Sequence, residues 1–346
     1  MKRIIKLIVK ALVCLFAFLL TAFVVVYFIT SGDHKVMKTA AHDQNVPQLT
    51  INNSALHVET FGSDTLQPVI VLHGGPGNDF SYLLSLKELS DEYFLIFYDQ
   101  LGSGLSERVD TDKLNLDNSI SDLDALVDRY GNGGKVNIIG HSWGGMLASA
   151  YLGKYPQKVN KIVLAEPGAL NPEMFRKFME RTGGLDAEFS FPLLWHLTKS
   201  WVSSYHVEQI DGQERMDYFL HHLIFDYAGE NHPIRGYFCD NTLPEDLPLW
   251  RWGSLASSSV QKSGMDEEGK FAVNLSAGVE NYTDTVLFLV GGCETFVGID
   301  FQLMNMTLFK HATMEVIPDA GHYMFNDKPN FCNEVVRKYF AEGKRK

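Results

Sequence analysis

The sequence lacks the cysteine and histidine spacings that build metal sites. Its four cysteines include no Cys-x-x-Cys pair, and none of its twelve histidines stands in a His-Glu-x-x-His pattern. The cysteines are Cys14, Cys239, Cys293 and Cys332. This set predicts neither a zinc knuckle nor a disulfide framework, although one bridge of unassigned pairing can form in an oxidising compartment. We therefore expect no metal cofactor.

The glycine-rich loops of nucleotide-binding proteins are also missing. Residues 102–104 read Gly-Ser-Gly and lack the third glycine of a dinucleotide fingerprint. Residues 133–135 read Gly-Gly-Lys and are followed by Val136, where a phosphate-binding loop needs Ser or Thr. We interpret both stretches as turns, so no nucleotide cofactor is expected.

Basic residues are in deficit. The chain has 30 Lys and Arg against 42 Asp and Glu, which gives a formal net charge of −12. The first thirty residues hold four basic residues and no acidic one, so the rest of the chain has a net charge of −16. A domain this acidic is not expected to bind nucleic acid or an anionic membrane surface.

One long uncharged run is present near the N-terminus. Four basic residues within the first ten precede residues 11–30, an uncharged stretch of twenty that is long enough to cross a bilayer as a helix. No Ala-x-Ala-like site follows, which favours an uncleaved anchor over a signal peptide. We expect residues 1–30 to form a cytoplasmic basic stub and a transmembrane anchor, followed by a linker over 31–47. The basic stub predicts a cytoplasmic N-terminus and an extracytoplasmic catalytic domain.

The chain after the linker alternates strand and helix patterns. This alternation extends over residues 48–167, beginning with a hairpin turned at Asn52-Asn53, and resumes over residues 281–346. It predicts an α/β fold with a mostly parallel sheet flanked by helices. Between the two parts, residues 168–280 contain four of the five tryptophans and a helix start near Pro172. We expect this segment to be a helical cap.

The strongest catalytic pattern is a glycine-rich turn around a serine. Residues 140–145 read Gly-His-Ser-Trp-Gly-Gly and lie between an apolar run, 136–139, and a helical pattern. A strand, a sharp turn with small residues and a helix are typical of a nucleophile elbow. The helix that begins after Ser142 directs free N–H groups to the place where an oxyanion forms. The pattern predicts Ser142 as a nucleophile.

A second glycine motif makes the family resemblance specific. Residues 73–77 read His-Gly-Gly-Pro-Gly and follow a predicted strand. Together with the elbow, this motif resembles the α/β-hydrolase superfamily and, within it, the proline iminopeptidase branch. Because glycines allow backbone N–H groups to approach a substrate closely, the N–H groups of Gly75 and Trp143 are candidates for an oxyanion hole.

A third segment is similar to the same branch but departs from it. Residues 98–104 are similar to the start of its Asp-Gln-Arg-Gly-x-Gly-x-Ser segment, with Leu101 where arginine is usual. The resemblance covers residues 48–167 and 281–346 and is weak between them.

The other members of a catalytic triad are expected after the serine, in the order acid and then histidine. His322 lies in a Gly-His loop after a predicted strand and matches the catalytic histidine of the family. Glu294 follows the predicted strand 286–290 and is similar to the family's Gly-x-x-Asp acid. Glu294 is therefore the expected acid, and Asp300 is the alternative.

These residues indicate a serine hydrolase that forms an acyl-enzyme and needs no cofactor. By resemblance, the expected activity is an aminopeptidase that releases a residue such as proline from small peptides. The alternatives are a carboxylesterase or lipid ester hydrolase, and a non-catalytic binding protein of the same fold. An aminopeptidase also needs an acid to pair with the substrate ammonium group. The candidates, among which the sequence does not decide, are Glu166, Glu173, Glu230, Asp240 and Glu245.

Overall fold

The computed structural model describes residues 2–182, 190–223, 233–241 and 248–342. Within these ranges the chain forms two compact units. The smaller unit consists of residues 1–36 and 189–229, and the larger unit consists of residues 37–188 and 230–346.

The larger unit is built on an eight-stranded sheet with the order β1-β2-β4-β3-β5-β6-β7-β8. The first two strands form the predicted antiparallel hairpin, with Asn52 and Asn53 at φ 47° and 65°. β2 is also antiparallel to β4, and every later pairing is parallel. The expected mostly parallel sheet is confirmed. The strands are β1 Gln48–Ile51, β2 Ser54–Phe61, β3 Gln67–Leu72, β4 Tyr93–Tyr98, β5 Val136–His141, β6 Val159–Ala165, β7 Val286–Gly291 and β8 Ala312–Ile317.

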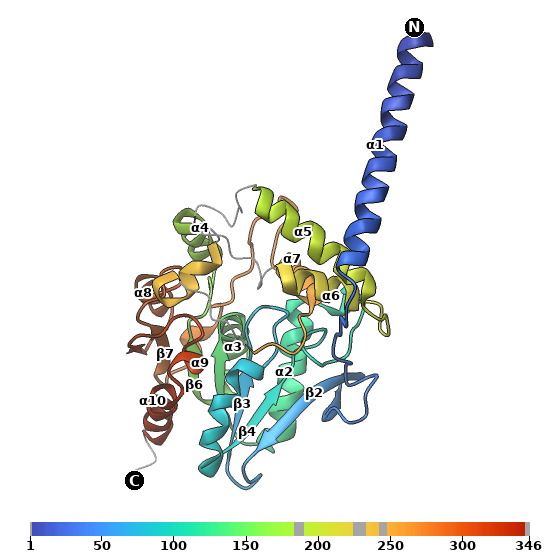
Figure 1. Ribbon diagram of the computed structural model, residues 1–346. Helices are drawn as coiled ribbons and strands as arrows, with labels where there is room; N and C mark the ends of the chain where they lie inside the picture. The colour runs from blue at the N-terminus through green and yellow to red at the C-terminus, as the bar shows by residue number, and fades with distance from the viewer. Residues whose placement is uncertain (1, 183–189, 224–232, 242–247, 343–346) are drawn as a thin grey trace. The chain divides into compact units, whose positions relative to one another are not determined.

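Helices cover both faces of the sheet (Figure 1). Alternate residues of β3 therefore face two different cores: Ile70 packs with the first and Val71 with the second, and both are fully buried. The first core contains α2 Leu116–Gly131 and α3 Trp143–Lys154. The second contains the 3-10 helix η1 Ser81–Asp91, α9 Met324–Asp327 and α10 Pro329–Ala341.

The described residues between β6 and β7 form helices and short 3-10 turns, and they belong to both units. In the larger unit these elements are α4 Pro172–Thr182, η6 Pro233–Tyr237, η7 Cys239–Asn241, α7 Ser254–Ser263 and η8 Val279–Asn281. In the smaller unit they are α5 Phe191–Ser203, η4 Ser204–His206 and α6 Glu214–His221. After β7, the larger unit also contains α8 Ile299–Met306.

The smaller unit joins α5 and α6 to the N-terminal helix α1, Lys2–Ile29. α1 has 28 residues and a mean hydropathy of 2.9 in its most apolar window, of which 6% is buried. It is long and apolar enough to cross a membrane, as a membrane anchor or a signal sequence does.

Candidate active site

The turn after β5 has the geometry of a nucleophile elbow. Ser142 lies between β5 and α3 with φ 54° and ψ −120°, a conformation that L-residues rarely adopt. Gly140 and Gly144 make this turn possible because the neighbouring backbone leaves no room for a Cβ atom at either position. A Cβ on Gly140 would lie 2.4 Å from the Gly144 carbonyl oxygen, and one on Gly144 would lie 2.2 Å from the Leu72 carbonyl oxygen. The predicted elbow therefore depends on close backbone packing.

His322 lies in the loop between β8 and α9 and is buried. Its backbone N–H donates to the Tyr237 carbonyl, and its own carbonyl accepts from His141 Nε2, each at 2.7 Å. The ring of Tyr237 packs on the imidazole with centroids 4.4 Å apart. The imidazole Nδ1 lies 2.7 Å from Glu166 Oε2. These contacts leave Nε2 as the nitrogen available for a proton transfer.

The carboxylate that holds His322 is Glu166, not the expected Glu294. Glu166 directly follows β6, has φ 43° and is fully buried. Its Oε1 accepts a hydrogen bond of 2.5 Å from the Gly291 N–H at the end of β7. Because β6 lies between β5 and β7 in the sheet, its carboxyl end brings Glu166 to the same edge as Ser142.

The prediction that Glu294 holds His322 is wrong in this structure. Glu294 Oε1 accepts from the N–H groups of Phe296 and Val297 at 2.7 and 2.9 Å, so this carboxylate binds its own loop. Its Oε2 is buried and has no hydrogen-bond partner among the described residues. Asp300, the alternative, is exposed in the first turn of α8. The sequence did contain a signal for Glu166, since an acid directly after the strand that follows the elbow helix lies at the catalytic edge.

Burial dominates the electrostatics of the His322 and Glu166 pair. It raises the pKa of Glu166 and lowers the pKa of His322 to about 3. The imidazole is therefore neutral at ordinary pH, which is the form a general base needs. Burial and the neighbouring Glu166 also raise the pKa of Glu294 to about 9, so that this second carboxyl is protonated at neutral pH.

The two candidate oxyanion donors border the same pocket as Ser142 and His322. In the part of the chain that the structure describes, the backbone N–H groups of Gly75 and Trp143 have no hydrogen-bond partner. The indole Nε1 of Trp143 donates to Gln100 Oε1 at 2.8 Å, which fixes the residue after the nucleophile. Both N–H groups are therefore free to bind a negatively charged oxygen.

The pocket is apolar. It has a volume of about 360 Å³. Its described lining residues include no Asp, Glu, Lys or Arg, and aromatic and methionine side chains supply much of its wall. Examples are Phe175, Phe178 and Met179 of α4, with Met265 and Phe271 after α7. The arrangement places a serine, a histidine and two N–H groups at the wall of an apolar cavity.

Comparison with known proteins agrees with this fold. The model of the alpha/beta hydrolase fold family matches residues 67–329. This chain belongs to the α/β-hydrolase family. It is 32% identical to a cis-3-alkyl-4-alkyloxetan-2-one decarboxylase of Shewanella oneidensis over 304 residues, which is 85% of this chain and 87% of that protein.

Two further similarities involve proline iminopeptidases. The chain is 45% identical to that of Heyndrickxia coagulans over 101 residues, which cover 29% of this chain and only 35% of that protein. The crystal structure of the proline iminopeptidase of Mycobacterium smegmatis has a TM-score of 0.57 at 18% identity and covers 85% of this chain and 98% of that one. A likeness at this identity shows the fold alone.

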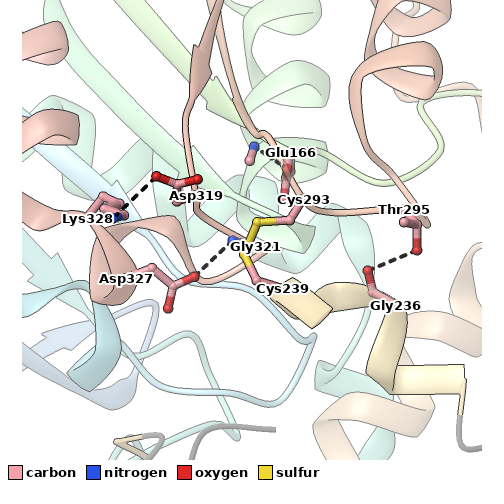
Figure 2. The surroundings of a disulfide bond; sticks show 10 residues. Glu166, Gly236, Cys239, Cys293, Thr295, Asp319, Gly321, Asp327 and Lys328 are labelled. Atoms are coloured by element: carbon pink, nitrogen blue, oxygen red, sulfur yellow. Dashed lines mark hydrogen bonds and ion pairs between the residues drawn. A yellow bond between two sulfur atoms is a disulfide. The ribbon is translucent and has the colours of Figure 1, made fainter. Parts of the chain in front are cut away.

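A disulfide joins two segments beside the histidine of this α/β hydrolase. Cys239 of η7 and Cys293, after β7, are bonded across 54 positions, a pairing that the sequence left unassigned. Figure 2 shows the bridge with Gly321 and Glu166 labelled near it. The Cys293 N–H donates to the Ala320 carbonyl at 3.1 Å, two residues before His322. The bridge therefore joins the segments that contain Tyr237 and Glu294, and backbone hydrogen bonds link both of these segments to the loop of His322.

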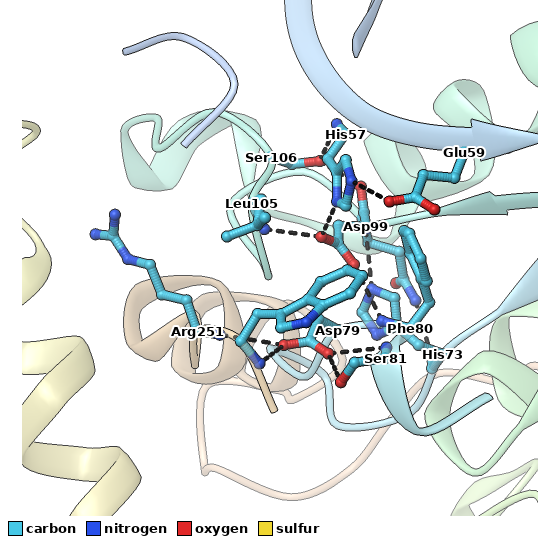
Figure 3. A network of polar contacts seen from close by, with 12 residues as sticks. His57, Glu59, His73, Asp79, Phe80, Ser81, Asp99, Leu105, Ser106 and Arg251 are labelled. Carbon is cyan, nitrogen blue, oxygen red and sulfur yellow. Dashed lines mark hydrogen bonds and ion pairs between the residues drawn. The ribbon is translucent and has the colours of Figure 1, made fainter. Parts of the chain in front are cut away.

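A second buried polar network holds the loop after β3 (Figure 3). Asp99 Oδ2 lies 2.7 Å from His57 Nδ1, and Asp99 Oδ1 accepts from the Phe80 N–H at 3.0 Å. Asp79 Oδ2 accepts from the N–H groups of Trp250 and Arg251 at 2.6 and 3.1 Å. None of these residues lines the pocket, so we interpret the network as support for the loop that contains Gly75.

Proposed function

We propose that this protein is a serine hydrolase that cleaves esters with apolar acyl groups through an acyl-enzyme. Ser142 Oγ attacks the ester carbonyl carbon, and His322 Nε2 accepts its proton. Glu166 orients the imidazole and stabilises the imidazolium, and the N–H groups of Gly75 and Trp143 stabilise the oxyanion. The imidazolium returns this proton to the leaving oxygen, which departs as the alcohol, and water then releases the acid from Ser142 by the same steps.

The observation that supports an ester substrate is the apolar pocket. Ser142 and His322 line a cavity whose described wall contains no carboxylate. An ammonium group placed there would lose its water without gaining a partner, which costs several kcal/mol. An alkyl chain, by contrast, gains about 0.8 kcal/mol for each buried CH₂ group.

A relative that matches most of the chain supports the same substrate class. The Shewanella oneidensis protein is named for an oxetan-2-one, which is a cyclic ester, with two alkyl substituents. The name describes the substrate of that relative. A molecule of this class has an ester carbonyl flanked by alkyl groups, and the apolar pocket of this chain suits such a molecule.

Aminopeptidase activity is the second candidate, because residues 73–77 and the elbow resemble the proline iminopeptidases. It needs a carboxylate for the substrate ammonium group. Glu166 is engaged by His322, and Glu173 is exposed and paired with Lys177. Asp240 does not line the pocket. The remaining candidates, Glu230 and Glu245, lie outside the described residues.

One experiment separates the candidates. The full-length protein in detergent is assayed with p-nitrophenyl esters from acetate to decanoate and with a proline arylamide, free or N-acetylated. We expect ester turnover whose kcat/KM rises with acyl length and is lost in Ser142→Ala. Cleavage of the free arylamide alone would instead establish an aminopeptidase. No turnover together with no labelling by a fluorophosphonate would indicate a non-catalytic protein.

We also propose that α1 is an uncleaved anchor with its N-terminus in the cytoplasm and the hydrolase domain outside. Its basic first ten residues support this orientation. The disulfide supports it too, because structural disulfides persist in oxidising compartments. Carbonate extraction should leave the protein in the membrane pellet, and protease added outside intact cells or spheroplasts should digest the domain. Release by carbonate would contradict the anchor.

A further inference from the structure

Helix α5 of the smaller unit presents an apolar face to its surroundings. Its N-cap residue is Ser190, whose Oγ accepts from the Leu193 N–H at 3.2 Å. Phe191, Leu194 and Trp195 have exposed fractions of 79%, 43% and 46%. Their spacing of i, i+3 and i+4 places them on one side of the helix. Three large apolar side chains on one exposed face of one helix need a partner if the protein is to stay soluble.

The same helix packs along α1. Side chains of α1 and α5 line a common groove of about 430 Å³, which includes Leu19, Phe23 and Val26 of α1 and Trp201 of α5. The ring of Phe23 also meets that of Tyr205, just after α5, with centroids 5.8 Å apart. Over this part of α1 the contacts are apolar.

The contacts become polar towards the end of α1. His206 Nε2 lies 3.0 Å from the Tyr27 carbonyl oxygen, and the two rings stack. His34 Nδ1 lies 2.8 Å from the hydroxyl of Tyr218 on α6, and His34 Nε2 lies 2.7 Å from the Thr30 carbonyl oxygen. This change from apolar to polar contacts is the change expected where a helix leaves a bilayer.

The position of these contacts along α1 sets the depth of α5. The uncharged stretch 11–30 has twenty residues, about 30 Å of helix, which is the full thickness of a bilayer core. Leu19 precedes its end by eleven residues, or about 16 Å. A helix that packs against Leu19 and Phe23 therefore cannot lie wholly in water when α1 spans the membrane.

We propose that α5 is immersed in the outer leaflet, with Phe191, Leu194 and Trp195 among the acyl chains of phospholipids. The sequence of α5 suits this place, because the helix contains no acidic residue in a chain that is otherwise strongly acidic. Its single cation, Lys199, is exposed one turn after Trp195, and its long stem can extend to the lipid headgroups. The protein is thus held by a spanning helix and by an interfacial helix packed on it. The proposal rests on α1 as an uncleaved anchor and does not depend on the substrate.

The test uses tryptophan fluorescence of the full-length protein in phosphatidylcholine vesicles. Replacing part of the lipid with phosphatidylcholine brominated on its acyl chains quenches only tryptophans in contact with those chains. We expect clear quenching of the wild type, a smaller loss of emission in Trp195→Phe, and little quenching in the Trp195→Phe/Trp201→Phe double variant. Trp252→Phe, a change at a buried tryptophan of the larger unit, is the matched control and should leave the quenching as in the wild type.

Two results would overturn the proposal. Quenching that is absent from the wild type, or equal in the wild type and the double variant, would show that α5 is outside the lipid. Protection of Trp195 from aqueous iodide without quenching by brominated lipid would indicate that a second copy or another protein covers the face. Because neither reading involves turnover, failure here is distinct from failure of the proposed ester hydrolysis.

Discussion

Glu166 Oε2 lies 2.7 Å from His322 Nδ1 across 156 positions of sequence, and the carboxylate is fully buried. Glu294, the acid nearer to His322 in sequence, binds its own loop instead. The two carboxylates are close enough for Glu166 to raise the pKa of Glu294. Their roles can nevertheless be separated, because only one of them holds the imidazole.

The first prediction concerns activity. Glu166→Gln should lower kcat by about 10⁴-fold, the scale of an acid-to-amide change in a serine triad, because the imidazole loses its charged partner. Glu294→Gln, the matched control, should keep kcat within a few-fold of the wild type. Both variants are assayed at pH 7 with the best p-nitrophenyl ester. The reverse ranking would restore Glu294 as the triad acid.

The second prediction concerns the acid limb of the pH profile. Burial lowers the pKa of His322 to about 3, so the neutral base persists well below the usual histidine pKa near 6.5. We expect kcat/KM to fall with a midpoint below pH 6 as the medium is acidified. Measuring kcat/KM from pH 4 to 8 on the wild type checks this. A midpoint at or above 6.5 would show that Glu166 raises the histidine pKa more than burial lowers it.

The third prediction concerns stability. Burial holds the pKa of Glu294 at about 9 in the folded protein, against its ordinary value of 4.5, so unfolding releases its proton above pH 4.5. Between pH 4.5 and 9 the carboxyl of Glu294 is ionised in the unfolded chain and protonated in the folded protein. The free energy of unfolding therefore falls as pH rises through this range, by up to about 1.4 kcal/mol for each pH unit. Glu294→Gln cannot ionise, so its Tm relative to the wild type should rise between pH 5 and pH 8.

The control for the third prediction is Glu173→Gln, at an exposed carboxylate of α4. Its Tm difference from the wild type should stay nearly constant over the same pH range. Parallel behaviour of the two variants would mean that Glu294 is ionised in the folded protein at neutral pH.

The sequence was sufficient where the signal is local. The elbow around Ser142, the hairpin turn at Asn52-Asn53 and the mostly parallel sheet follow from glycine placement and apolar runs within a few residues, and the structure has all three. His322 was identified by its Gly-His loop, and the structure brings it to the pocket of Ser142.

The sequence was insufficient to predict the triad acid and the disulfide, because both depend on which strand ends and loops lie side by side in the fold. Acids follow both β6 and β7, and spacing along the sequence favours Glu294. In the fold, two N–H groups of its own loop bind the Glu294 carboxylate instead. From the sequence, Glu166 is a candidate only as a partner for a substrate amine. The pairing of Cys239 with Cys293 is a contact of the same long-range kind, which no local pattern encodes.

The fourth prediction concerns this disulfide. The bridge closes 54 positions of chain, and losing such a link costs about 4 kcal/mol in the chain-entropy view. It also joins two segments that hydrogen-bond the loop of His322: the Tyr237 carbonyl accepts from the His322 N–H, and the Cys293 N–H donates to the Ala320 carbonyl. Replacing both cysteines by alanine should therefore lower both Tm and kcat.

Dithiothreitol makes the fourth prediction specific to the bond. Reduction should bring the wild type down to the Tm and kcat of the Cys239→Ala/Cys293→Ala variant and leave that variant unchanged. Cys332 is free and buried, so Cys332→Ala should respond to the reductant as the wild type does. If dithiothreitol lowers the activity of the double variant as well, the loss does not come from this bridge. If the double variant keeps full kcat with a lowered Tm, the bridge stabilises the fold without positioning His322.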